Sequence, residues 1–210
     1  VEIQTALGIK GFGFDMNVAC SSATFGIDMA VNAVRTGAAR AILVVNPEIT
    51  SGHNNCELRD FHFIFGDACT ALVLERTDDA EADGVGDRAH RWEVLGTKLA
   101  TQFSNNIRND FGFLNSSEVV ERDAHELVFR QNGQMVFREV CPMVAAHITT
   151  HLDVLGLDAA DVRRFWLHQA NLNMNQLISR RVLGREPEPA ETPVILDRYA
   201  NTSSAGSIIA

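Results

Sequence analysis

The chain has 210 residues, of which 46% are hydrophobic and 21% are charged, and its formal net charge is −9. This composition is ordinary for a globular protein with a hydrophobic core. The acidic charge argues against general nucleic-acid binding because no long basic stripe offsets it. No run approaches the roughly 18 apolar residues that a membrane-spanning helix needs.

The four cysteines lie far apart and include no Cys-x-x-Cys pair; they are Cys20, Cys56, Cys69 and Cys141. This spacing argues against a zinc cluster, and four cysteines in a chain of this length do not form a disulfide scaffold. We therefore expect a cytoplasmic protein without a zinc cluster. No other metal site and no bound cofactor are expected. Because the chain begins with Val1 and its last segment resembles a helix that has just started, we also expect it to be part of a longer protein.

Three elements are predicted in the first 50 residues. Residues 13–18 and 41–45 are apolar runs typical of buried strands. Residues 21–36 carry apolar side chains at helical spacing, and Gly37 suits the position just past a helix end. Strand, helix and strand in this order predict a parallel crossover unit. Cys20 lies where the first strand meets the helix.

Further strands and loops are predicted up to residue 127. Residues 51–63 are a polar connection, 64–75 have strand character, and 77–88 are an acidic loop. Residues 92–101 are predicted to form one more strand. Residues 103–127 are irregular, and a loop of that length inside a domain is usually functional or mobile.

The second half repeats the pattern of strands and helices. Residues 131–155 and 172–183 are predicted helices, ended by Gly156 and Gly184. Residues 162–167 and 194–196 are predicted strands. His168 ends the first of these strands, and Asn201 follows the second. The chain is therefore expected to be an α/β protein made of two pseudo-repeats, with a site at the strand ends.

Cys20, His168 and Asn201 share one local position, between the end of a predicted strand and the start of a helix. The amide groups of a helix N-terminus stabilise a thiolate, so a cysteine at this position can be acidic and nucleophilic. Each residue taken singly also has a simpler explanation. A free cysteine is often just buried, a lone histidine is often structural, and an asparagine can cap a helix.

Five short motifs occur in order along the chain: NVACSSA at 17–23, FGDA at 65–68, NG at 132–133 with Phe137, LHQAN at 167–171 and YANTSSA at 199–205. In these motifs the chain resembles β-ketoacyl-acyl-carrier-protein synthase III, a condensing enzyme of the thiolase fold, over nearly its whole length. The resemblance implies two pseudo-repeated mixed-sheet halves in an α-β-α-β-α layered arrangement. Residues 1–100 would belong to the N-terminal half, 101–130 to a loop and acyl-pocket connection, and 131–210 to an incomplete C-terminal half.

The same resemblance implies a catalytic triad and its chemistry. Cys20 would accept an acyl group from a thioester. His168 and Asn201 would then hold the enolate oxygen that forms when a malonyl thioester loses carbon dioxide. Attack of this carbanion on the acyl group of Cys20 would give a 3-oxoacyl thioester, which is a step of fatty-acid synthesis.

Other positions correspond to family residues outside the triad. Arg59 would contact coenzyme A, Ile64 and Phe137 would line the acyl pocket, and Asn171 would lie beside the catalytic histidine. The residues expected to dock acyl carrier protein are Arg138, Arg180 and Arg181. The implied partners are acyl carrier protein, acyl-CoA and a second copy in a homodimer, with no nucleic acid and no membrane. The sequence departs from the family pattern at Ala200, which replaces a glycine, and at Asn173, which replaces an arginine.

Several alternatives stay open at the level of sequence. The long loop, with Phe113 and Leu114 and with Phe129 nearby, suggests a pocket for a medium-length acyl primer. A same-fold enzyme that joins two acyl thioesters, or that transfers an acyl group to another acceptor, could use the same triad. The order Cys, His, Asn also occurs in papain-like proteases. A degenerate, non-catalytic partner subunit is the remaining alternative.

Overall fold

The computed structural model describes residues 2–54, 63–78, 91–108 and 129–210. Its α-helices are α1 (Glu2–Ala6), α2 (Ser22–Arg35), α4 (Gly133–Leu155), α5 (Leu172–Leu183), α6 (Leu196–Tyr199) and α7 (Gly206–Ile209). Its 3-10 turns are η1 (Ala19–Ser21), η2 (Thr50–His53), η5 (Ala159–Asp161) and η6 (Ser203–Ala205). Its strands are β1 (Ala41–Glu48), β2 (Ala68–Glu75), β3 (Ile107–Arg108) and β4 (Arg130–Gln131). None of these helices is long and apolar enough to cross a membrane.

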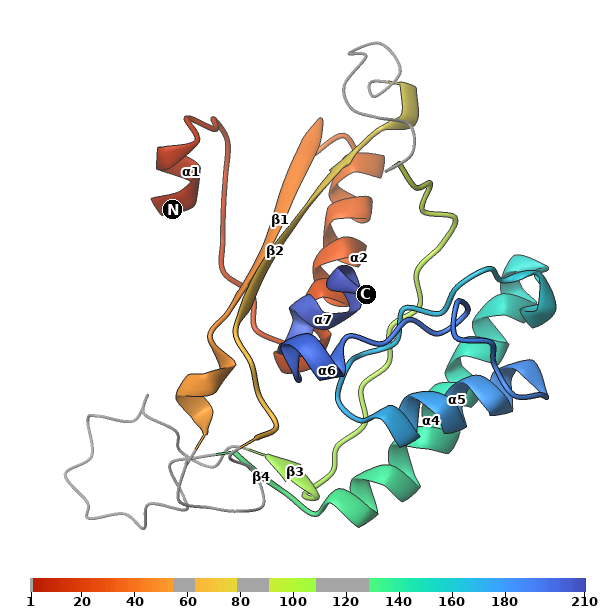
Figure 1. Ribbon diagram of the computed structural model, residues 1–210. Helices are drawn as coiled ribbons and strands as arrows, with labels where there is room; N and C mark the ends of the chain where they lie inside the picture. Colours follow the sequence, from red (N-terminus) through yellow and green to blue (C-terminus); the bar gives the residue numbers. More distant parts are fainter. Residues whose placement is uncertain (1, 55–62, 79–90, 109–128) are drawn as a thin grey trace.

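Helix α2 packs on the β1–β2 pair through a stripe of small and branched residues (Figure 1). The prediction of a helix over 21–36 is confirmed. Gly26 makes the close approach possible, because a Cβ at this position would lie 2.9 Å from Cγ1 of Val44. The stripe that faces inward comprises Ala23, Gly26, Ala30, Val31 and Val34. Burial of each valine contributes about 1.5–3 kcal/mol before entropy costs.

Strands β1 and β2 pair antiparallel, with Ala41 opposite Glu75 and Glu48 opposite Ala68. The predicted parallel crossover through residues 13–18 is wrong, because that segment runs without a ladder partner and Phe14 is 65% exposed. An apolar run shows that a segment can be extended, but a strand also needs a neighbour to accept its backbone hydrogen bonds.

Three more predicted strands are not strands in the structure. Residues 92–101 and 162–167 have no regular secondary structure, and residue Leu196 of the segment 194–196 begins helix α6. Segment 162–167 is nevertheless held in place, since Phe165 N donates to Glu191 O at 2.7 Å. The described strands form two separate two-stranded sheets, β1–β2 and β3–β4.

Helices α4 and α5 pack side by side and contribute to the main hydrophobic cluster (Figure 1). The predicted helices at 131–155 and 172–183 are confirmed. Asn132 caps α4 by accepting from Met135 N at 3.3 Å. Gly156 and Gly184 end the two helices at φ 68°, a backbone conformation that favours glycine. The buried members of this cluster are Cys141, Ala145, Phe165, Ile178 and Val182.

The last fifteen residues leave the α4–α5 pair and pack against the first half of the chain. Figure 1 shows α6 and α7 beside the lower part of α2 and the β1–β2 pair. The turn η6 contacts η1, β1 and α2. As a result, Asn201 lies near the segment that contains Cys20. The division of the chain at residues 100 and 130 stays a prediction.

Candidate active site

Cys20 lies in the 3-10 turn η1, two residues before α2 begins at Ser22. Side-chain bonds to the backbone shape this turn. Asn17 Oδ1 accepts from Ala19 N at 2.9 Å, and the Ser22 hydroxyl accepts from Val18 N at 2.9 Å and donates to Ala19 O at 2.7 Å. Ala19 has φ 47°. The polar residues of the NVACSSA motif therefore hold the half-buried thiol at the helix start.

Asn201 is fixed from both sides by backbone bonds. It forms an isolated parallel bridge with Phe65, in which Asn201 N donates to Ile64 O at 2.9 Å and Gly66 N donates to Asn201 O at 3.1 Å. Its side-chain Oδ1 accepts from Ser203 N at 2.9 Å, and the residue is 6% exposed. The FGDA and YANTSSA motifs thus form one structural unit.

Ser203 lies between Cys20 and His168, the other two candidate catalytic residues. Its hydroxyl lies within hydrogen-bonding reach of the thiol of Cys20, and its backbone lies within hydrogen-bonding reach of the ring of His168. Its φ of 51° lies in the left-handed region, where a serine is strained. The structure therefore brings Cys20, His168 and Asn201 together around one residue, to which sequence reasoning gave no role of its own.

His168 is positioned by the completely buried side chain of Gln169. Gln169 Nε2 donates to Leu167 O at 2.9 Å and to Pro193 O at 3.2 Å, and its Oε1 accepts from Ile195 N at 3.2 Å. This amide links the segment before His168 to the segment that leads to Asn201. The position of Gln169 inside the LHQAN motif was the only sequence signal for this role.

Electrostatics keep both the thiol and the imidazole neutral. Burial raises the pKa of the Cys20 thiol; the Ser203 hydroxyl lowers it, and the negative charge of Glu48 raises it further. Burial lowers the pKa of His168 to about 4, against smaller opposing effects of Ser203 and Glu48. The acidic thiol that the helix start allows is therefore not favoured at Cys20, because desolvation outweighs the stabilisation of the thiolate at the helix start.

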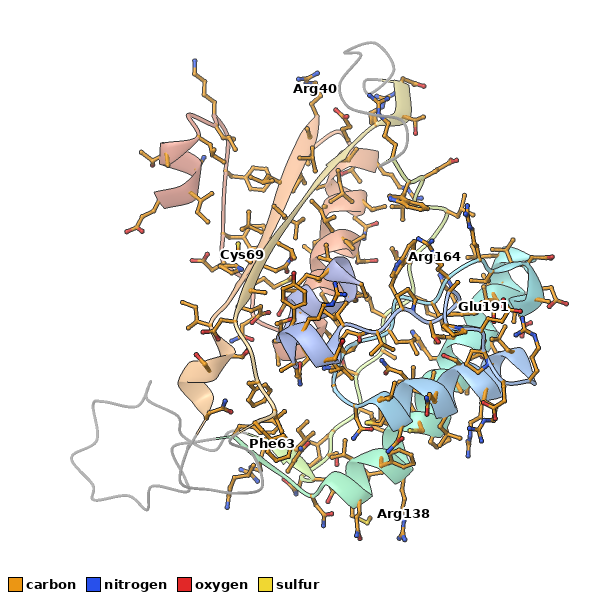
Figure 2. All side chains as sticks on the ribbon, viewed as in Figure 1. Arg40, Phe63, Cys69, Arg138, Arg164 and Glu191 are labelled. Carbon is orange, nitrogen blue, oxygen red and sulfur yellow. The ribbon has the colours of Figure 1, made fainter. Side chains whose placement is uncertain are left out.

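The candidate substrate-binding residues lie in different places. Ile64 borders Asn201 through its backbone, and Arg59 lies outside the described residues. Phe137 and Arg138 line a shallow hollow at the start of α4 together with Gly133 and Gln134. In Figure 2, Arg138 lies at the lower edge of the molecule, away from β1 and β2.

The remaining candidates lie on or near α5. Asn171 is the N-cap of this helix, and its Oδ1 accepts from Asn173 N at 2.9 Å and from Met174 N at 3.3 Å. Arg180 is exposed and pairs with Glu186 at 2.7 Å. Arg181 is also exposed and lies near Cys141, where burial raises the pKa of the thiol and the charge of Arg181 partly offsets that rise. Docking of a carrier protein by these arginines stays a prediction.

One part of the loop hypothesis falls within the described residues. The ring of Phe129 packs edge-on against Phe65, with centroids 5.1 Å apart. Phe113 and Leu114 lie outside the described residues. The acyl-pocket role of this loop remains a hypothesis.

Two family models match the chain. Residues 14–91 match 3-oxoacyl-[acyl-carrier-protein (ACP)] synthase III, and residues 152–210 match the C-terminal part of the same enzyme. Together they cover more than half of the chain. The chain is also 59% identical over all of its 210 residues to beta-ketodecanoyl-[acyl-carrier-protein] synthase of Pseudomonas aeruginosa. The chain belongs to the β-ketoacyl-acyl-carrier-protein synthase III family. The papain-like alternative finds no support in these matches.

Further synthase III relatives agree with this assignment. The chain is 32% identical over 206 residues to beta-ketoacyl-[acyl-carrier-protein] synthase III of Acidiphilium cryptum. It covers 58% of the Pseudomonas protein's length and 59% of the Acidiphilium protein's length. The chain thus spans less than two thirds of these synthases.

Solved structures of a synthase III enzyme and of a priming β-ketosynthase have the same fold. The structure of 3-oxoacyl-(acyl carrier protein) synthase III from P. aeruginosa matches 99% of this chain and 60% of that chain, with a TM-score of 0.78 at 20% identity. The priming β-ketosynthase of the R1128 polyketide pathway matches 100% of this chain and 59% of its own, with a TM-score of 0.77 at 25% identity. The expectation of a thiolase-like α/β fold is confirmed.

Proposed function

We propose that the protein is a condensing acyltransferase of the synthase III type. The observation that carries the proposal is the convergence of Cys20, His168 and Asn201 on Ser203, whose amide donates to Asn201 Oδ1 and whose side chain and backbone lie next to the thiol of Cys20 and the ring of His168. A nucleophile, a neutral imidazole and a side-chain amide at one point suit carbon–carbon bond formation between thioesters. The chemistry uses protein side chains and thioester substrates, with no metal or prosthetic group.

In the first half-reaction, Cys20 takes the acyl group. Its sulfur attacks the carbonyl carbon of the thioester, the new C–S bond forms, and the donor leaves as a thiol. Because the resting thiol is protonated, its proton is lost as the sulfur attacks and ends on the sulfur of the departing donor. A backbone amide at the start of α2 can donate to the oxyanion that develops.

In the second half-reaction, a malonyl thioester loses carbon dioxide and leaves an enolate. Neutral His168 and the amide of Asn201 can each donate a hydrogen bond to its oxygen. The carbanion then attacks the acyl carbonyl on Cys20, the C–S bond breaks, and the released thiolate takes up a proton. Burial favours this arrangement because a neutral imidazole with pKa about 4 remains a donor without an added charge.

The proposed acyl group is of medium length. The Pseudomonas relative is named a beta-ketodecanoyl-[acyl-carrier-protein] synthase. A 3-oxodecanoyl product contains an octanoyl unit and the two carbons that a malonyl thioester donates. We therefore propose octanoyl thioester as the donor, either as acyl-CoA or on a carrier protein, and malonyl-acyl-carrier protein as the acceptor. A cytoplasmic homodimer is the proposed setting.

Intact mass spectrometry of the full-length protein tests the proposal. After incubation with octanoyl-CoA, the wild type and a Cys69→Ala control should each gain one octanoyl group, whereas Cys20→Ala should gain none. Addition of malonyl-acyl-carrier protein should release the group as a 3-oxodecanoyl thioester. Acylation that persists in Cys20→Ala, or the absence of any condensation product, would contradict the proposal.

Relative rates with acetyl- and octanoyl-thioesters test the chain length separately. We expect a higher kcat/KM for octanoyl thioester. A clear preference for acetyl thioester would reject the medium-chain donor and leave the condensing chemistry intact. A product that contains two acyl chains instead would identify an enzyme that joins two acyl thioesters.

A further inference from the structure

Glu48, the last residue of β1, holds the turn that contains Ser203. Its Oε1 accepts from Ser204 N at 3.1 Å and also from the Ser204 hydroxyl. Ser204 is 1% exposed, and its hydroxyl lies 3.2 Å from Oδ1 of Asn46 on the same strand. The end of β1 thus carries a half-buried carboxylate that bonds to the residue after Ser203.

The turn needs such an anchor because its backbone is strained. Ser203 has φ 51°, and a residue in that region costs on the order of 1–3 kcal/mol unless its surroundings hold it. Asn201 Oδ1 binds the amide of Ser203, and Glu48 binds the next amide along the chain. These two bonds hold the backbone and the hydroxyl of Ser203 next to His168 and Cys20.

The charge of Glu48 acts on the same two residues. Its negative charge disfavours the thiolate of Cys20 and favours protonation of His168. Within the described ranges Glu48 has no salt bridge to lysine or arginine. A half-buried carboxylate is screened less by solvent than an exposed one.

We propose that Glu48 is a positioning residue for the condensation reaction. It holds Ser203 between Cys20 and His168 through Ser204, and its negative charge adds to the effect of burial in favouring the thiol form of Cys20. This role rests on the proposed function, because it presumes that Cys20 carries the acyl group.

Two substitutions separate the hydrogen bonding of Glu48 to Ser204 from the effect of its negative charge. Glu48→Gln keeps an oxygen that can accept from Ser204 but removes the charge, whereas Glu48→Ala removes both. Glu75→Gln, at the opposite end of the β1–β2 pair, is the matched control. Each variant of the full-length protein is assayed for Cys20 alkylation by iodoacetamide as a function of pH, for octanoyl transfer and for condensation.

We expect Glu48→Gln to shift the alkylation profile of Cys20 to lower pH, with condensation within about threefold of wild type. Glu48→Ala should lower the condensation rate about 10- to 100-fold, the scale of a lost hydrogen bond to a charged group. Glu75→Gln should match the wild type in every assay. If Glu48→Gln retains condensation and Glu48→Ala loses it, the reaction needs the hydrogen bond of Glu48 to Ser204 and not its negative charge.

The proposal fails if the alkylation profile of Glu48→Gln coincides with that of the wild type, or if folded Glu48→Ala condenses at the wild-type rate. If Glu48→Ala does not fold, the pH dependence of Cys20 alkylation in Glu48→Gln tests the proposal. A wild type that takes up no acyl group would overturn the proposed function instead, and the alkylation profiles would still decide the role of Glu48.

Discussion

Phe65 and Asn201 form a parallel bridge that joins the segment before β2 to the loop after α6. Thr50 reinforces it, since its hydroxyl donates to Gly66 O at 2.5 Å. Ser51 holds the next residue, because its backbone N donates to Asp67 Oδ1 at 2.8 Å and its hydroxyl to Oδ2 at 2.6 Å. The position of the Asn201 side chain therefore depends on a backbone contact that a single added atom can break.

Gly66→Ala should break this contact. A Cβ at residue 66 would lie 2.2 Å from the carbonyl oxygen of Tyr199, which is backbone and cannot rotate away. We expect a loss of about 1–3 kcal/mol in the free energy of unfolding, together with reduced condensation. Gly52→Ala is the control, because a Cβ there meets nothing within 4 Å. Equal stabilities of the two variants in denaturant unfolding would contradict the bridge.

Ala200→Gly should stabilise the protein. Ala200 has φ 55° and ψ −153°, a region in which glycine is strongly favoured, and this is the position where the family has glycine. Relief of strain of about 1–3 kcal/mol should exceed the roughly 0.5–1 kcal/mol that glycine costs in the unfolded chain. We expect a net gain of about 1 kcal/mol by denaturant unfolding. Ala33→Gly in helix α2 is the control and should destabilise the protein by about 1 kcal/mol. If Ala200→Gly also lowered the free energy of unfolding, the backbone at Ala200 would not be strained.

Alkylation of Cys20 should be slow at neutral pH and should still be accelerating at about pH 9. The reason is that burial and Glu48 raise the pKa of this thiol above its usual range, so the reactive thiolate is scarce until the pH is high. Peptide mass spectrometry after iodoacetamide treatment measures the Cys20 rate separately from that of exposed Cys69. A rate that levels off near neutral pH would show an acidic thiol instead.

Asn201→Asp should separate the two half-reactions. Aspartate keeps the oxygen that accepts from Ser203 N but loses the amide donor and adds a negative charge near the enolate. We expect malonyl decarboxylation to fall by about 10²–10³-fold, as when an oxyanion donor is removed, while Cys20 still takes up octanoyl groups. Decarboxylation at the wild-type rate would exclude Asn201 as the donor.

Helices were predicted well because their signals are local. The ranges 21–36, 131–155 and 172–183 each carried a 3.6-residue period and an end signal such as Gly37, and the structure has a helix in each. The strands at 13–18, 162–167 and 194–196 were wrong. Strand formation depends on a hydrogen-bonding neighbour elsewhere in the chain, which an apolar run does not specify.

The sequence by itself determined the candidate residues Cys20, His168 and Asn201, because each stands in a motif with a defined local setting. Only the tertiary structure placed Ser203 between them and Glu48 behind it, since those contacts join segments far apart in the chain. The tertiary structure also determines the protonation states of Cys20 and His168. Desolvation depends on everything packed around a group, and at Cys20 it outweighed the effect of the adjacent helix start.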